Sequence, residues 1–442
     1  MRVGKNIQTT SKRPFVFLAF LLITAGFTYW SFNTFGYYWT VLIPNVLLLY
    51  ITTVLLVVYL DGFHKYDKPP LREEFAPVTV IIPSYNCKDL IGQTIDSLKA
   101  SDYPDDIEIL VVDDGSTDGT RDMLEGIKGI RLVLKDENEG KAEALNEAIK
   151  IASHDYIFCV DSDSFVSKNA IRDMMAKMLS DETVGAVTCF VKVSNNKSLL
   201  GKVQEIEYFV GFGFSAITNY MLDAVFVTPG PMTLFRKEAL LRVGFFDVSN
   251  ITEDLEMAWR LRKAGYKITY AYEAVVYTMV PQTLSALLRQ RIRWYRGKLS
   301  NISKHRDMFL NPKYEYFGMF IMPFSLASEL AAMGTIYFIT YMVGYTLFWN
   351  VQVVLAYIHT DSLTLVNLIT GLFGSSAGIF MFLIVVIPWM YAILVSHKLG
   401  NKDLSLTDIP AIGVFLFVYS VFLSGVYVYS LFQEIYGSDY LW

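Results

Sequence analysis

The sequence predicts an α/β domain with a Rossmann-like, mostly parallel, doubly wound sheet, joined to an α-helical transmembrane bundle. Between residues 61 and 313, short apolar runs rich in β-branched and aromatic residues alternate with stretches of helical periodicity. That order is typical of a parallel sheet with helices on both faces. Outside this region the chain is strongly apolar. The whole sequence is 53% hydrophobic and 18% charged, which is too apolar for an ordinary soluble protein.

The predicted domain begins with strands and helices in alternation. The strands are expected at residues 78–82, 107–112, 130–134 and 156–160. The helices are expected near residues 90–100, 120–127, 141–151 and 170–179. Ligands of such sheets bind beyond the carboxyl ends of the strands. We therefore expect one crevice where three polar groups follow strands: Pro83-Ser84-Tyr85-Asn86, Asp113-Asp114-Gly115-Ser116 and Asp161-Ser162-Asp163.

Apolar stretches at both ends predict membrane segments. Residues 15–30 and 38–60 are each near the ~20 residues that cross a bilayer, so residues 1–60 are expected to form a hairpin. About three more spans are expected within residues 314–442, near residues 317–348, 365–395 and 409–432.

The distribution of basic residues predicts the orientation. Lys and Arg are absent from the loops at residues 31–37, 350–364 and 433–442. By the positive-inside rule, the chain is expected to be a multi-pass plasma-membrane protein whose domain at residues 61–280 is cytoplasmic. A net charge of −5 argues against a nucleic-acid partner. The three cysteines, Cys87, Cys159 and Cys189, lack metal-ligand spacing and indicate a reducing compartment.

Asp161 and Asp163 predict a cation site. Side chains alternate along a strand, so the two carboxylates point the same way if strand geometry persists past Val160. Two carboxylates aimed at one place repel each other unless a cation lies between them. Oxygen ligands favour Mg²⁺ or Mn²⁺. The alternative is a simple polar turn, since Asp and Ser are common turn residues.

Asp113, Asp114 and Lys141 are candidates for binding a nucleotide. The two carboxylates can accept hydrogen bonds from a base N–H or a ribose hydroxyl, although the same Gly-rich turn also suits helix capping. Lys141 opens a predicted helix, where a cation opposes the macrodipole. A bound diphosphate would offset that charge. A solvated surface lysine is the alternative.

Two later segments also carry candidate residues. Gly230 allows the backbone to approach a ligand closely, or else forms an ordinary turn before a strand. Glu253 and Asp254 open an amphipathic helix. Because a carboxylate is the usual cap at such a position, a structural role for Asp254 is the alternative to a functional one.

Residues 281–298, within a basic region at residues 281–313, predict an amphipathic helix of the kind that lies in the membrane interface. Apolar positions recur on one face and basic positions on another, namely Leu284, Leu288, Ile292 and Tyr295 against Arg289, Arg293 and Arg296. Gln290, Arg293 and Trp294 share one side of this helix. Their amide, guanidinium and indole suit a phosphate and a sugar ring, whereas contact with lipid headgroups is the alternative.

In this order, the motifs resemble those of the processive, membrane-integrated family 2 glycosyltransferases, which synthesise cellulose, chitin, hyaluronan and poly-N-acetylglucosamine. The resemblance covers the soluble domain and its flanking spans, and implies a GT-A fold. It also implies uridine binding near Pro83 and by Tyr85, Asp113 and Asp114, and a metal ion at Asp161 and Asp163. It further implies that Asp254 is the general base, and that Gln290, Arg293 and Trp294 hold the diphosphate and the acceptor sugar.

Individual motifs resemble different branches of that family. Thr-Glu-Asp with Trp259, and Gln-Arg-Ile-Arg-Trp followed by Gly297, are most similar to poly-N-acetylglucosamine synthases. Gly230-Pro231 is more similar to the hyaluronan and chitin-oligosaccharide branch. Cys189-Phe190 depart from the family pattern, in which a Gly and a polar residue are expected.

The resemblance implies an inverting hexosyltransferase that adds sugars from a UDP-sugar to a growing polysaccharide. The expected donor is UDP-N-acetylglucosamine, alone or with a second UDP-sugar. The expected partners are the lipid bilayer, through which the spans pass the polymer, and an accessory secretion subunit. Two alternatives are a non-processive transferase that glycosylates a lipid phosphate and a non-catalytic membrane receptor for a nucleotide-sugar.

Overall fold

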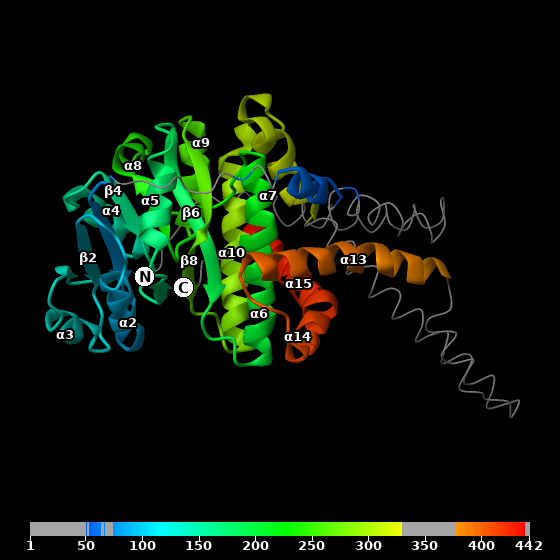
Figure 1. The fold of residues 1–442 in the computed structure, drawn as a ribbon, viewed down its shortest axis with the longest axis horizontal. Coiled ribbons are helices and arrows are strands. Elements are labelled where there is room, and N and C mark those ends of the chain that lie inside the picture. Colours follow the sequence, from blue (N-terminus) through cyan, green and yellow to red (C-terminus); the bar gives the residue numbers. More distant parts are fainter. Residues whose placement is uncertain (1–49, 51–52, 63–65, 67–73, 329–375, 438–442) are drawn as a thin grey trace, which may run out of the picture.

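The computed structural model describes residues 50, 53–62, 66, 74–328 and 376–437. The predicted N-terminal hairpin lies almost entirely outside these residues, as do residues 329–348 and 365–375 of two predicted C-terminal spans. The fold of the central domain and of the last helices follows from the described part (Figure 1).

The domain is built on an eight-stranded sheet with the strand order β3-β2-β1-β4-β7-β6-β8-β5. The strands are β1 (Val78–Ser84), β2 (Ile107–Asp114), β3 (Arg131–Lys135), β4 (Tyr156–Cys159), β5 (Ser164–Val166), β6 (Val184–Val193), β7 (Thr233–Arg236) and β8 (Lys267–Thr278). The four strands predicted from the sequence are β1 to β4, and they pair in parallel as expected. Parallel pairing aligns Ser84 with Asp113, so the carboxyl ends of β1 and β2 meet at one edge.

The prediction of a mostly parallel, doubly wound sheet holds only in part, because the second half of the sheet combines a parallel β6–β8 pair with antiparallel pairs. β7 pairs antiparallel with both β4 and β6, and β5 pairs antiparallel with β8. The physical reason is the connection between β6 and β7, which runs through a long helical segment at residues 199–221 before the chain re-enters the sheet between strands already in place. The sheet is therefore mixed, with a parallel half that carries the first three polar groups.

Helices cover both faces of the parallel half, as the alternation predicts. They are α2 (Lys88–Lys99), α3 (Thr120–Glu125), α4 (Lys141–Ile151) and α5 (Ala170–Met178). In β1, Val80 and Ile82 pack in one apolar cluster with α2 and α5, whereas Ile81 packs in the opposite cluster with α4. This split follows from the alternation of side chains along a strand.

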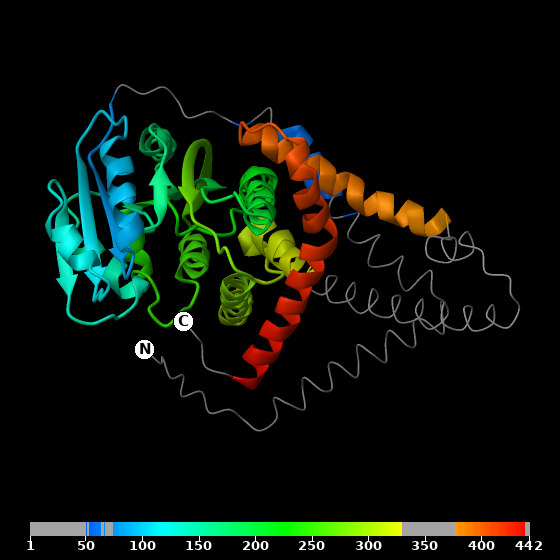
Figure 2. The same cartoon turned by 90° about the horizontal axis from the view of Figure 1, so that it is seen from below.

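The second half of the chain adds helices beside the sheet. They are α6 (Leu199–Phe209), α7 (Ala216–Met221), α8 (Lys237–Val243), α9 (Glu253–Lys263), α10 (Leu284–Lys304), α13 (Ser376–Leu399), α14 (Ile409–Val414) and α15 (Ser420–Tyr436). Figures 1 and 2 show α15 running alongside α10. Within the described residues, one helix, Leu406–Tyr436, is long and apolar enough to cross a membrane. The multi-pass topology and the transmembrane bundle stay predictions.

Two residues of segments expected at the membrane contact other parts of the described structure. Phe317, at the start of the predicted span of residues 317–348, is fully buried and packs edge-on against Trp259, with its ring centroid 5.8 Å away. Arg296, assigned from the sequence to the basic face of the interfacial helix, is 3% exposed and pairs with Glu434 of α15 at 3.3 Å. Tertiary packing against α9 and α15 accounts for both differences.

Candidate active site

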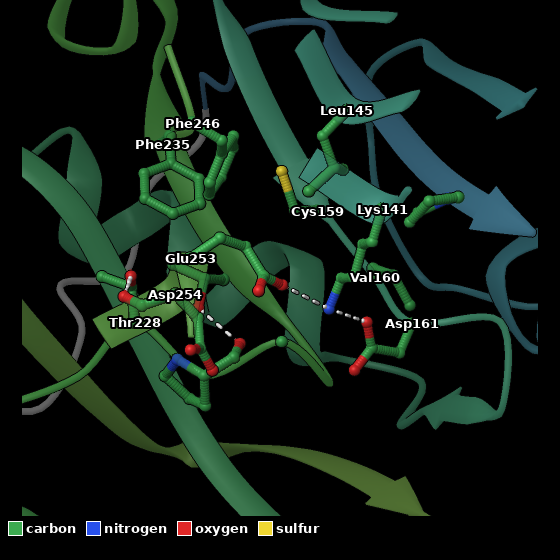
Figure 3. Close-up of a pocket in the computed structure, with 14 residues that line it drawn as sticks. Lys141, Leu145, Cys159, Val160, Asp161, Thr228, Phe235, Phe246, Glu253 and Asp254 are labelled. Atoms are coloured by element: carbon green, nitrogen blue, oxygen red, sulfur yellow. Dashed lines mark hydrogen bonds and ion pairs between the residues drawn. The ribbon is translucent and has the colours of Figure 1, made fainter. Parts of the chain in front are cut away.

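A pocket opens where β1, β4 and the start of α9 meet (Figure 3). It brings together six of the residues predicted from the sequence, namely Pro83, Lys141, Asp161, Gly230, Glu253 and Asp254. Its other lining residues are mostly apolar: Leu145, Cys159, Val160, Thr228, Pro229, Thr233, Phe235 and Phe246. Charged groups thus meet at the mouth of an otherwise apolar recess, which strengthens their electrostatic interactions.

Lys141 joins the two sides of this pocket. It is the first residue of α4, and its Nζ lies 2.5 Å from Asp161 Oδ1 and 3.3 Å from Glu253 Oε1 (Figure 3). Burial alone lowers the pKa of Lys141, but Asp161, Glu253 and Asp254 outweigh it and raise the pKa above its ordinary value. Lys141 is therefore cationic at neutral pH. The alternative that Lys141 is a solvated surface lysine does not account for these two ion pairs. The function of Lys141 as a diphosphate ligand stays a prediction.

Gly230 approaches this ion pair closely. A Cβ atom at Gly230 would lie 2.7 Å from both Asp161 Oδ2 and Lys141 Nζ, closer than real Cβ contacts come. The glycine in the Thr-Pro-Gly-Pro segment thus leaves room for the charged pair in its observed position. Any side chain at this position would displace Lys141 or Asp161.

Asp161 and Asp163 come together through a turn and not through a continued strand. β4 ends at Cys159, residues 162–163 form a turn, and the Ser164 N–H donates to the Asp161 carbonyl at 3.1 Å. Burial, followed by repulsion from Asp161, raises the pKa of Asp163 to about 6, with Lys141 opposing the shift. The expected strand geometry past Val160 is therefore wrong, yet the two carboxylates still interact.

This carboxylate pair fits a hard divalent cation that takes its remaining ligands from a substrate. In the part of the chain that the structure describes, no group of three or more His, Cys, Asp or Glu side chains is placed to hold a metal ion. Mg²⁺ and Mn²⁺ sites of nucleotide enzymes typically use one or two carboxylates together with phosphate oxygens. The mutual repulsion that raises the pKa of Asp163 is what a cation at this position would relieve.

Asp254 does not act as an ordinary helix cap. Thr252 occupies the N-cap position of α9 without a side-chain cap hydrogen bond, and Asp254 Oδ1 accepts only from the adjacent Leu255 N–H, at 2.8 Å. The Thr228 hydroxyl donates to the Asp254 carbonyl at 2.6 Å and fixes the backbone beside the pocket. Burial and then Glu253 raise the pKa of Asp254 to about 6, against the effects of Lys141 and Arg293.

Asp113 and Asp114 lie at the end of β2, outside the pocket, and are held by cations. Arg121 Nε lies 3.2 Å from Asp113 Oδ2, and Lys135 Nζ lies 3.1 Å from Asp114 Oδ1. Asp114 also accepts from the Glu139 and Gly140 N–H groups at 3.1 and 2.8 Å, which caps the approach to α4. Asp114 therefore has a structural role, because it holds the loop that leads into α4.

Asp113 differs from Asp114, because one of its carboxylate oxygens accepts no hydrogen bond from the described residues. Asp113 is fully buried, and its Oδ1 has no hydrogen-bond partner among the described residues. Buried acceptors are normally paired, so an unpaired one marks a place where a ligand donor fits. Tyr85, directly after β1, is 48% exposed and free to cover a ligand at this end of the sheet.

Gln290, Arg293 and Trp294 lie on α10, as predicted, but do not line the pocket. Arg293 Nη1 donates to the Ile251 carbonyl at 3.1 Å, and its charge acts on Asp254. Trp294 is half-buried against the sheet's apolar core. Of the three, Arg293 therefore borders the site, from the side of the loop that precedes α9.

Several residues at the site were missed by sequence reasoning. Arg121 and Lys135, which hold Asp113 and Asp114, lie on elements that read as ordinary surface. Phe235 and Phe246 form the apolar back of the pocket, although they come from β7 and from the loop after α8. No local pattern marks these residues, because only the pairing of β7 with β4 brings them to the site.

Replacing Asp254 by Asn should stabilise the protein above about pH 6. The pKa of Asp254 is raised from 3.8 to about 6, so the folded state binds the proton more tightly than the unfolded state. Stability is therefore lost as the pH rises between these values. Asp254→Asn should raise the Tm at about pH 8 and lose this advantage near pH 4, as measured by thermal unfolding at both values.

Asp247→Asn is the matched control, because the pKa of Asp247 is shifted in the opposite direction and the expected change in Tm has the opposite sign. Burial opposes ionisation of Asp247, but hydrogen bonds from Lys304 and Ser249 outweigh it and lower the pKa to about 2. This substitution should lower the Tm at about pH 8. A lower Tm for both variants would mean that Asp254 serves as a stabilising cap.

Comparison with known proteins agrees with this geometry. Residues 79–244 match the model of glycosyl transferase family 2. The chain is 36% identical over 261 residues to the poly-beta-1,6-N-acetyl-D-glucosamine synthase of Staphylococcus aureus, an alignment that covers 58% of this chain and 63% of that one. It is 32% identical over 271 residues to the synthase of the same name from Staphylococcus epidermidis, with 61% and 64% covered. The chain thus spans just under two thirds of these relatives.

Among solved structures, the fold is similar to that of a mannosyltransferase from Pyrobaculum calidifontis, determined in complex with GDP-mannose and Mn²⁺. The TM-score is 0.54 at 20% identity, over 89% of this chain and 95% of that one. This likeness concerns the fold, which is a GT-A-like mixed sheet with helices. Residues 79–244 therefore match glycosyl transferase family 2, in a chain that is similar to two staphylococcal polysaccharide synthases.

Proposed function

We propose that this protein is a processive, inverting glycosyltransferase that polymerises UDP-N-acetylglucosamine into an extracellular polysaccharide and passes the polymer across the membrane. The observation that carries the proposal is the position of Lys141. Its ammonium lies between Asp161 and Glu253, and Glu253 is followed in the chain by Asp254, whose charge also acts on Lys141. A cation for a leaving diphosphate and a base for an attacking hydroxyl are thus adjacent.

Asp254 is the general base of the proposed reaction. It takes the proton from the acceptor hydroxyl as that oxygen attacks the anomeric carbon from the face opposite to UDP. A carboxyl with a pKa of about 6 is ionised at neutral pH and is more basic than an ordinary Asp. Such a base contributes roughly 10²–10⁴-fold to the rate.

The charge on the departing UDP is neutralised at the Lys141 side of the pocket. Lys141 binds a phosphate oxygen, and Arg293 adds a second positive charge near Asp254. Asp161 and Asp163 would hold Mg²⁺ or Mn²⁺, which stabilises the leaving diphosphate by several kcal/mol when bound. The mannosyltransferase of similar fold was solved with Mn²⁺, which supports this choice.

The nucleoside is assigned to the end of β2. The buried, unpaired Asp113 Oδ1 accepts from a base N–H, and the exposed ring of Tyr85 covers the base. The similarity to the two staphylococcal synthases supports N-acetylglucosamine as the sugar and a polysaccharide as the acceptor. The helix Leu406–Tyr436 supports attachment to a membrane.

The decisive experiment supplies membranes containing the protein with a panel of labelled UDP-sugars and sizes the product. Wild type should form long polymer from UDP-N-acetylglucosamine, at a rate that rises with pH through about 6 as Asp254 ionises. Asp254→Asn should abolish polymer while UDP affinity, measured by titration calorimetry, stays within about twofold. A lipid-soluble product of one or two sugars would instead establish a transferase that acts on a lipid phosphate.

Chelation should abolish polymer synthesis, and added Mg²⁺ or Mn²⁺ should restore it. Asp163→Asn should reproduce the effect of chelation, because it removes half of the carboxylate pair. Asp173→Asn is the control, since burial and Glu273 also raise the pKa of this carboxyl, on α5, to about 6. Full activity in excess chelator rules out the metal assignment.

Trp294→Ala should eliminate long polymer and spare UDP binding. The indole supplies a flat apolar face for the terminal sugar, whereas the nucleotide is bound by residues on β2, α4 and the turn after β4. Slow hydrolysis of the donor should persist. Leu288→Ala, at an exposed apolar position of the same helix, is the control for membrane attachment. Polymer of wild-type length from Trp294→Ala would exclude the stacking role.

A further inference from the structure

Arg291 lies on α10 between Trp294, which the proposed function assigns to the acceptor, and Gln290, which the resemblance to polysaccharide synthases places in the same motif. Its Nη1 donates to Gln290 Oε1 at 2.6 Å, and its guanidinium lies over the Trp294 ring, 4.0 Å from the centroid. The residue is 1% exposed, so its planar group is enclosed by these partners. One side chain therefore contacts both Gln290 and Trp294.

The charge of Arg291 is anchored from a different helix. Its Nη2 forms an ion pair with Glu207 of α6, and the Tyr419 hydroxyl donates to the same Glu207 oxygen at 2.7 Å. Tyr419 belongs to the helix Leu406–Tyr436, the candidate membrane span. A continuous path of contacts thus runs from that helix through Glu207 and Arg291 to Trp294. Figures 1 and 2 show the helices that supply these residues side by side.

This arrangement restricts the movement of both acceptor-side groups. Because the guanidinium covers one face of the indole, a sugar can stack only on the other face. Because Gln290 Oε1 is engaged, the amide NH₂ of Gln290 is the group left to donate to a ligand. A buried guanidinium destabilises the protein unless a carboxylate pairs with it. The position of Glu207 therefore determines the position of Arg291.

We propose that Arg291 is a positioning residue for the acceptor, and that Glu207 and Tyr419 connect it to the C-terminal helix. This inference rests on the proposed polymerising function. Movement of that helix, which on the proposed topology borders the path of the polymer, then shifts Gln290 and Trp294 together. At the end of β2, the contacts of Asp113 and Asp114 are with Arg121, Lys135 and the loop before α4, and none of these residues belongs to this path.

The test uses the full-length protein in membranes and two substitutions of different severity. Arg291→Lys keeps the charge but loses the planar fork that reaches Glu207, Gln290 and Trp294 at once. It should lower polymer yield about tenfold and shorten the product, the size expected for losing one hydrogen bond to a charged group. Tyr419→Phe removes one hydroxyl and should shorten the product less. UDP affinity should stay within about twofold in both, and the ratio of donor hydrolysis to transfer should rise.

Lys202→Gln is the matched control. Lys202 also ties α6 to the C-terminal helix, through Asp408 at 2.7 Å, but contacts none of the residues of the proposed path. It should leave product length unchanged. The inference is overturned if this variant shortens the polymer as much as Arg291→Lys does, if UDP affinity falls in parallel, or if both test variants make polymer of wild-type length. If Arg291→Lys does not fold, Tyr419→Phe decides. Failure of the wild-type protein to make polymer rejects the proposed function and is seen before any variant is compared.

Discussion

The ion pairs of Lys141 are the interactions on which the geometry of the pocket depends. Asp161 follows β4 and Glu253 opens α9, so the two carboxylates come from elements more than ninety residues apart and meet only at this ammonium. Asp163 and Asp254 lie close enough to add their charges. Four carboxylates around an apolar recess repel each other strongly unless a cation is present. Gly230 is part of the same arrangement, since no side chain fits against the pair.

The two ends of the crevice differ in how their charge is balanced. At the end of β2, the charges of Asp113 and Asp114 are already paired with those of Arg121 and Lys135. At the end of β4, Lys141 forms the ion pairs with Asp161 and Glu253, Arg293 acts on Asp254, and the pKa of Asp163 stays raised. The remaining negative charge at the end of β4 attracts further cations. On the proposed function, the end of β2 binds the neutral base of the nucleotide and the end of β4 binds its charged diphosphate.

Helix α10 joins the site to the C-terminal part of the chain. Arg293 holds the loop before α9, and Gly297 lets α10 pack directly against Thr252, because any side chain there would collide with the threonine. On its other sides the same helix is tied to α6 through Arg291 and to α15 through Arg296. The position of Asp254 and the position of the apolar C-terminal helix are therefore linked through one rigid element.

The local pattern of the sequence determined the parallel half of the sheet, its helices and the identity of the charged residues, because apolar runs and turn residues act within a few positions along the chain. Lys141 and Asp254 could be selected in this way. The mixed pairing of strands β5 to β8, the turn that joins Asp161 to Asp163 and the buried state of Arg291 and Arg296 could not. These features depend on which distant segments pack together: β7 enters beside β4 only after a long helical connection, and each arginine is buried only because another helix supplies its glutamate.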